Sequence, residues 1–70
     1  MRPSDIGNLI RDTRKKQSLL QSELAAAAGV GLRFLIELES GKTTAQLGKT
    51  LTVLAALGCR LHVQTPEDKR

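Results

Sequence analysis

The sequence is poor in the residues on which much protein chemistry depends. Its 70 residues include one cysteine, Cys59, and one histidine, His62. A single cysteine excludes an internal disulfide, and these two side chains fall short of the four ligands of a structural zinc site. Tryptophan and tyrosine are absent and Phe34 is the only phenylalanine, which argues against single-strand binding by base stacking. We therefore expect no metal and no cofactor.

Other absences bound the class of protein. No apolar run approaches the roughly 20 residues that span a membrane, and charges interrupt the apolar residues of MRPSDIGNLIRD, so no signal peptide is expected. No carboxylate pair, nucleophile–base set or phosphate loop can be assembled, which argues against an enzyme. A single small domain buries a limited core, and oligomerisation is then the expected source of extra stability. The formal net charge of +4 suggests a polyanionic partner.

The spacing of apolar residues predicts a chain of helices. Glycines at positions 29, 41 and 58 are the expected stops, Thr43 to Gln46 matches a capping box, and Ser18 with Gln21 is a further candidate box. The expected helices run from Pro3-Ser4-Asp5, with Ser4 as N-cap, to about Gln17, from Gln21 to Gly29, from Leu32 to Ser40, and from Thr43 to Leu57. The expected inward residues are Ile6, Leu9, Ile10, Thr13, Leu24, Ala25, Ala28, Leu35, Leu38, Leu47, Leu51 and Leu54, with Val53 and Leu57 on a second flank.

The segment GCRLHVQ, residues 58–64, has a different period. Cys59, Leu61 and Val63 alternate with polar residues, which predicts a half-buried β-strand. Nothing else in the chain reads as a strand, so the backbone of this one needs a partner outside its own chain. We favour antiparallel pairing with the same segment of a second copy, and the alternative is addition to another protein. The domain then covers residues 1–64, and 65–70 form a polar tail.

Two short helices around Gly29-Val30-Gly31 are typical of a helix-turn-helix. The residues IRDTR (10–14), Gln21, Leu24-Ala25, Gly29-Val30, Leu35 and ELESGK (37–42) resemble the phage-repressor-like (Cro/C1, Xre) helix-turn-helix family. GKTTAQLGKTLTVLAALG (41–58), followed by a strand, is more narrowly similar to the HipB-type antitoxins, which are dimeric repressors that partner HipA-type toxin kinases.

The resemblance implies an all-α, lambda-repressor-like domain of four to five helices with a short C-terminal β-strand that pairs across a homodimer. It implies a sequence-specific repressor of a palindromic operator in double-stranded DNA, located in the bacterial cytoplasm at the nucleoid. The narrower likeness implies the antitoxin of a HipBA-like toxin–antitoxin system that represses its own operon and binds a toxin kinase. The alternative is a stand-alone Xre-type repressor without a toxin partner.

The third helix carries the predicted DNA contacts. At 100° per residue, Arg33 and Glu37 fall opposite the inward Leu35 and Leu38. Arg33 would grip guanine, Glu37 would accept from cytosine N4, and Leu32 or Ile36 would touch a thymine methyl. The alternative is that Arg33 and Glu37 form an ordinary exposed i, i+4 ion pair without a role in DNA binding. The resemblance adds Leu32, a contact of Gln21 with a base or the DNA backbone, and backbone contacts of the residues that follow the third helix. The predicted DNA site is therefore Gln21, Leu32, Arg33, Glu37, Ser40, Lys42 and Thr43.

The resemblance also implies a partly buried ion pair between Arg14 and Glu39, which is structural rather than part of the DNA site. Arg11, Lys15 and Lys16 are further candidates for phosphate contacts, or an ordinary solvated face. The chain departs from the family pattern where Leu20, Gly31 and Phe34 replace the usual small hydroxyl residues, which places side-chain phosphate contacts at these three positions in doubt.

Overall fold

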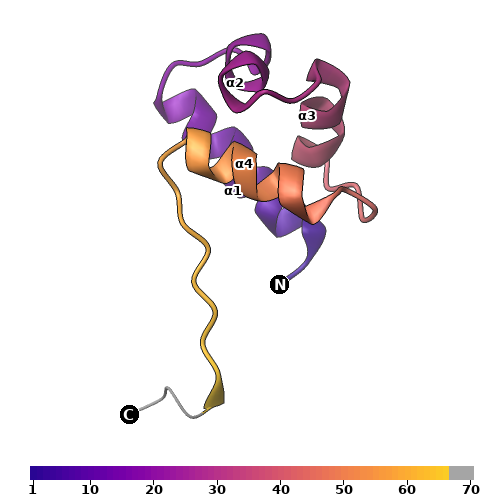
Figure 1. Ribbon diagram of the computed structural model, residues 1–70, viewed down its shortest axis with the longest axis vertical. Helices are drawn as coiled ribbons and strands as arrows, with labels where there is room; N and C mark the ends of the chain where they lie inside the picture. Colours follow the sequence, from indigo (N-terminus) through magenta and orange to yellow (C-terminus); the bar gives the residue numbers. More distant parts are fainter. Residues whose placement is uncertain (67–70) are drawn as a thin grey trace.

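A computed structural model describes residues 1–66, in which the chain forms four α-helices and no β-strand. They are α1 (Pro3–Lys16), α2 (Gln21–Ala28), α3 (Leu32–Glu39) and α4 (Leu47–Ala56). The helix α1 packs against α3, and α2 contacts both α3 and α4. Figure 1 shows the two short helices, α2 and α3, joined by a tight turn, and the C-terminal segment leaving the helices. The predicted all-α class is confirmed, with the lower number of helices.

The predicted opening of α1 at Pro3 is confirmed, but the predicted N-cap, Ser4, is wrong. Pro3 is the first helical residue and Arg2 is the N-cap. Proline suits this position because its φ is preset and it has no N–H to leave unpaired. The Asp5 carboxylate accepts the Arg2 backbone N–H at 2.7 Å. Ser4 therefore lies inside the first turn and does not cap the helix.

All four helices end in the same Schellman hydrogen-bond pattern. In each, a residue with positive φ donates its N–H to the carbonyl three residues back, and the next residue donates to the carbonyl five residues before it. The predicted glycine stops at 29, 41 and 58 are confirmed. The residue that closes α1 is not a glycine but Ser18, with φ 58°. The alternative capping box at Ser18 is wrong, because α2 begins after Leu20, whose N–H is accepted by Glu23 at 2.7 Å.

The helix α4 begins later than the sequence predicts. Its first residue is Leu47 and its N-cap is Gln46, so Thr43 to Gln46 do not form a capping box. Instead, these residues belong to the connection that follows the turn at Gly41. Ala45 in this connection packs against the core. The chain therefore covers the core with an irregular segment before it turns into α4.

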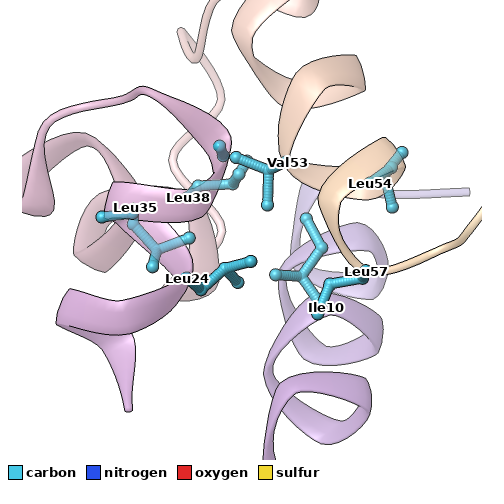
Figure 2. Packing of buried hydrophobic residues seen from close by; sticks show 9 residues of the cluster. Ile10, Leu24, Leu35, Leu38, Val53, Leu54 and Leu57 are labelled. Carbon is cyan, nitrogen blue, oxygen red and sulfur yellow. The ribbon is translucent and has the colours of Figure 1, made fainter. Parts of the chain in front are cut away.

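The core draws on all four helices. Ile10, Leu24, Leu35 and Val53 are fully buried, and Figure 2 shows Ile10 of α1 facing Leu24 of α2 and the α4 side chains. Three predicted inward residues, Leu9, Leu47 and Leu51, are exposed instead. The face that α4 turns inward is Thr50, Val53, Leu54 and Leu57, which is shifted around the helix from the predicted face. The face that α4 buries is therefore set by its packing against α2, and the leucine spacing alone does not predict it.

Gly7 lets α1 and α3 approach closely. A Cβ at this position would lie 2.5 Å from the backbone oxygen of Leu38 and 2.8 Å from that of Glu39. Such distances are far inside van der Waals contact, so any side chain would force the helices apart. The glycine therefore sets the distance between α1 and the end of α3.

The predicted β-strand at 58–64 is not formed in this single chain. Residues 59–65 follow α4 without helix or strand pairing. Leu61 and Val63 are 52% and 71% exposed. A strand requires a partner for its backbone, and the chain on its own provides none. Four residues of the predicted polar tail, 67–70, lie outside the described part.

Candidate nucleic-acid interface

A buried ion pair joins α1 to the last residue of α3. Arg14 Nε lies 2.7 Å from Glu39 Oε2, and Arg14 Nη2 lies 3.0 Å from Glu39 Oε1. Arg14 Nη1 also donates to the Leu19 carbonyl at 2.8 Å. Both side chains are almost fully buried, and the hydrogen bond with Glu39 raises the pKa of Arg14 above its ordinary value. The ion pair that the resemblance implied is confirmed, with a structural role.

Gln21 extends this network to the start of α2. Its Nε2 donates to Glu39 Oε1 at 3.1 Å, and the residue is half-buried. The same carboxylate therefore accepts from α1 and from α2 while belonging to α3. This arrangement fixes how the first residue of α2 stands beside α3. The spacing of the sequence gave no sign of this contact.

An exposed group of charges follows along α3. The Arg33 side chain is 91% exposed, and its Nε lies 3.8 Å from Glu37 Oε2. That distance is too long for a hydrogen bond. Lys42 Nζ approaches Glu37 Oε1 at 3.0 Å and is the closer partner. The exposed i, i+4 ion pair between Arg33 and Glu37 is therefore present but loose, and the Arg33 guanidinium stays accessible to a ligand. Glu37 is held more closely by Lys42 from the following loop.

Apolar side chains lie exposed on the same helix. Leu32 and Ile36 are each 45% exposed, while Leu35 and Leu38 are buried. The outward positions therefore carry one exposed guanidinium and two aliphatic side chains. Such a surface can offer both hydrogen bonds and methyl contacts to base edges in a major groove.

The residues after α3 are already partly engaged. The Ser40 hydroxyl donates to the Glu37 carbonyl at 2.8 Å, and Lys42 pairs with the Glu37 carboxylate. Thr43 is exposed. The structure thus brings Ser40 and Lys42 to Glu37 at the C-terminal end of α3, while Arg33 lies one turn before Glu37 on the same exposed face.

Lys49 is a cation near this surface that the sequence did not single out. Its Nζ lies 5.5 Å from the centre of the Phe34 ring, a cation–π distance. Phe34 is half-buried and packs against the core. Lys49 belongs to the first turn of α4, and the contact crosses two helices, so no spacing within one helix could have indicated it.

Other cations lie on α1. Arg11, Lys15 and Lys16 are exposed and enter no ion pair within residues 1–66. In the same range, no three histidine, cysteine or acidic side chains gather as a metal site. No helix in the described chain has the length and apolar character needed to cross a membrane.

Comparisons with known proteins agree with this geometry. A family model described as helix-turn-helix matches residues 10–64. An uncharacterized HTH-type transcriptional regulator, y4mF, of Sinorhizobium fredii (strain NBRC 101917 / NGR234) is 56% identical over 68 residues. The alignment covers 97% of this chain and 90% of that protein.

Proposed function

Because the chain belongs to the Cro/C1-type helix-turn-helix family of DNA-binding transcriptional regulators, we propose that it is a sequence-specific repressor that places α3 in the major groove. The observation that carries the proposal is the division of α3 into two faces. Leu35 and Leu38 are buried, while Arg33, Leu32 and Ile36 are exposed. A recognition helix requires this combination of an anchored inner face and a free outer face.

The proposed contacts divide into base readers and backbone contacts. Arg33 forms a bidentate pair with guanine, and Leu32 or Ile36 contacts a thymine methyl. Glu37 accepts from cytosine N4, and it can do so while its Oε1 pairs with Lys42, because a carboxylate has further acceptor sites. Ser40, Lys42 and Thr43 contact the phosphates that flank the groove. Gln21 contacts DNA from the start of α2.

To test this, the wild-type protein first selects DNA fragments from a randomised duplex pool. The affinity of Arg33→Ala for these fragments is then compared with that of the wild type. Loss of one bidentate pair lowers affinity by about tenfold to a hundredfold and relaxes the preference at one base pair. Lys16→Ala is the matched control, since it removes the same charge from α1. It is expected to lower affinity evenly across sequences. If Arg33→Ala retained both affinity and preference, α3 would not be the reading element.

We further infer that the working form is a homodimer built by residues 58–64. Two features support it: the exposed Leu61 and Val63 of the extended segment, and the exposed Leu47 and Leu51 of α4. In a two-fold dimer, the antiparallel strands satisfy one another's backbone groups and cover apolar surface. Two recognition helices about 34 Å apart then read a palindromic operator. Pairing of the strand with another protein is the alternative.

A finer proposal is that the protein is a HipB-like antitoxin that represses its own operon and binds a HipA-like toxin kinase in the bacterial cytoplasm, at the nucleoid. It rests on the resemblance of residues 41–58 and of the following segment. A stand-alone repressor is the alternative. The test is co-purification with a HipA-like kinase encoded beside this chain. Arg33→Ala is expected to lose operator binding and keep the kinase, and loss of both from a folded variant would mean that the two surfaces coincide.

A further inference from the structure

The side-chain amide of Gln21 is held in one orientation. Its Nε2 faces Glu39 Oε1 at 3.1 Å, and that carboxylate is already paired with the Arg14 guanidinium. An ionised carboxylate only accepts hydrogen bonds. Turning the amide around would set its oxygen against a carboxylate oxygen. The nitrogen of Gln21 therefore points inward and its Oε1 points away from Glu39.

The outward oxygen is accessible and unused. Within residues 1–66, no hydrogen bond to Gln21 Oε1 is formed. The same part of the chain has no buried side-chain nitrogen or oxygen without a partner. An unpartnered Oε1 on this half-buried residue must therefore reach solvent. Gln21 thus presents a fixed hydrogen-bond acceptor beside α3.

DNA restricts what this acceptor can bind. Phosphate oxygens and deoxyribose carry no hydrogen-bond donor, so the backbone offers Oε1 no partner. In the major groove the donors are the exocyclic amines, adenine N6 and cytosine N4. On the basis of the proposed function, we propose that Gln21 is a specificity-determining residue that accepts a hydrogen bond from the exocyclic amine of an adenine or cytosine. The second hydrogen on Nε2 is free for adenine N7 or a phosphate.

Arg14 and Glu39 are then positioning residues for this contact. Neither reaches the surface, but together they decide which end of the Gln21 amide faces outward. Without them the amide can rotate and present its donor, which suits guanine O6 or thymine O4. The buried ion pair that joins α1 to α3 would in this way also restrict the base preference of Gln21.

The experiment is selection from a randomised double-stranded DNA pool by the full chain and by Gln21→Met. The wild-type motif is expected to hold adenine or cytosine at one position per half-site. Gln21→Met, similar in size and with only a weakly accepting sulfur, is expected to lose that preference by about tenfold while all other positions keep theirs. Evenly weaker binding to an unchanged motif would overturn the proposal, because it would mean that Gln21 contacts only phosphate or water.

A double variant tests the positioning role. Arg14→Met with Glu39→Met replaces both charges by apolar side chains, a change that buried ion pairs often tolerate. It is expected to bind the Arg33-dependent part of the motif unchanged and to accept guanine or thymine at the Gln21 position. An unaltered preference there would refute the positioning role. Failure of the wild type to enrich any sequence would instead contradict the proposed function itself, so the two failures are distinguishable.

Discussion

At the scale of single residues, the Arg14–Glu39 pair should dominate the response to mutation. Glu39→Met leaves a guanidinium buried without its anion, which costs about 3–5 kcal/mol. The double variant Arg14→Met/Glu39→Met removes both charges and is expected near the wild-type free energy of unfolding. Urea unfolding followed by circular dichroism measures both. A loss in the double variant equal to the sum of the losses in Glu39→Met and in Arg14→Met would mean that the two charges are not coupled.

The pH dependence of this pair follows from the raised pKa of Arg14. A group whose pKa is higher in the folded state contributes its full stabilisation below the unfolded pKa and loses it only as the pH rises through the folded pKa. For arginine both values lie in strong alkali. The free energy of unfolding is therefore expected to show no step due to Arg14 between about pH 6 and 9. A step present in the wild type and absent from the double variant would contradict this.

Two helical glycines should respond in opposite directions to alanine. Gly7→Ala places a methyl group 2.5 Å from the Leu38 oxygen, and the separation of α1 from α3 is expected to cost about 1–3 kcal/mol. Gly48→Ala is the matched control, since no atom lies within 4 Å of its added Cβ. It is expected to stabilise the protein by up to about 1 kcal/mol through helix propensity. Thermal unfolding compares them, and a stable Gly7→Ala would show that the helices can part without cost.

The site could be predicted from the sequence only as far as each contact lay within one helix. The 100° rotation per residue was enough to place Arg33 outward, because Leu35 and Leu38 fix the inner face. The contacts Lys42–Glu37, Lys49–Phe34 and Gln21–Glu39 join different elements. Spacing carries no information on such contacts, and only the resemblance indicated the ion pair of Arg14.

At the scale of helices, the ends were more predictable than the starts. Glycine at positive φ marks three of the four ends. The N-caps are Arg2, Leu20, Gly31 and Gln46, none of which accepts a backbone N–H through its side chain. Without serine, threonine or aspartate at these positions, the usual sequence signal for a helix start is missing. This explains why α4 was predicted to begin at Thr43.

The end of α1 offers a stabilising change. Ser18 holds φ 58°, a conformation that costs an L-residue about 1–2 kcal/mol and glycine very little. After the extra entropy of glycine in the unfolded chain, Ser18→Gly is expected to stabilise by about 0.5–1 kcal/mol. Gly29→Ala, at φ 70° with open space around its Cβ, is the mirror experiment and should destabilise by about 1 kcal/mol. Opposite signs in urea unfolding are the expected result, and equal signs would contradict a backbone origin.

At the scale of the whole molecule, apolar surface remains uncovered. Nine hydrophobic residues make the core, yet Leu47, Leu51, Leu61 and Val63 are 40% to 71% exposed. The first two were predicted to face inward because their spacing is helical. Periodicity detects an apolar stripe but does not tell whether the chain itself or a second copy covers it. For the same reason, the segment at 58–64 read as a strand although the single chain cannot pair it.

Sedimentation equilibrium decides whether a second copy covers this surface. We expect the full chain to sediment as a dimer. Leu61→Glu/Val63→Glu is expected to sediment as a monomer, because the two charges would lie on the strand face that covers apolar surface in the dimer. The monomer fold should persist, since both side chains are exposed in it. A truncation that ends after Cys59 is likewise expected to be a monomer, and it keeps the Gly58 and Cys59 N–H groups that close α4. Arg60→Glu/His62→Glu places glutamates on the other face of the strand, and this control is expected to remain a dimer.

A dimer that survives Leu61→Glu/Val63→Glu would exclude the strand from the interface. A monomeric full chain would assign the strand to another protein.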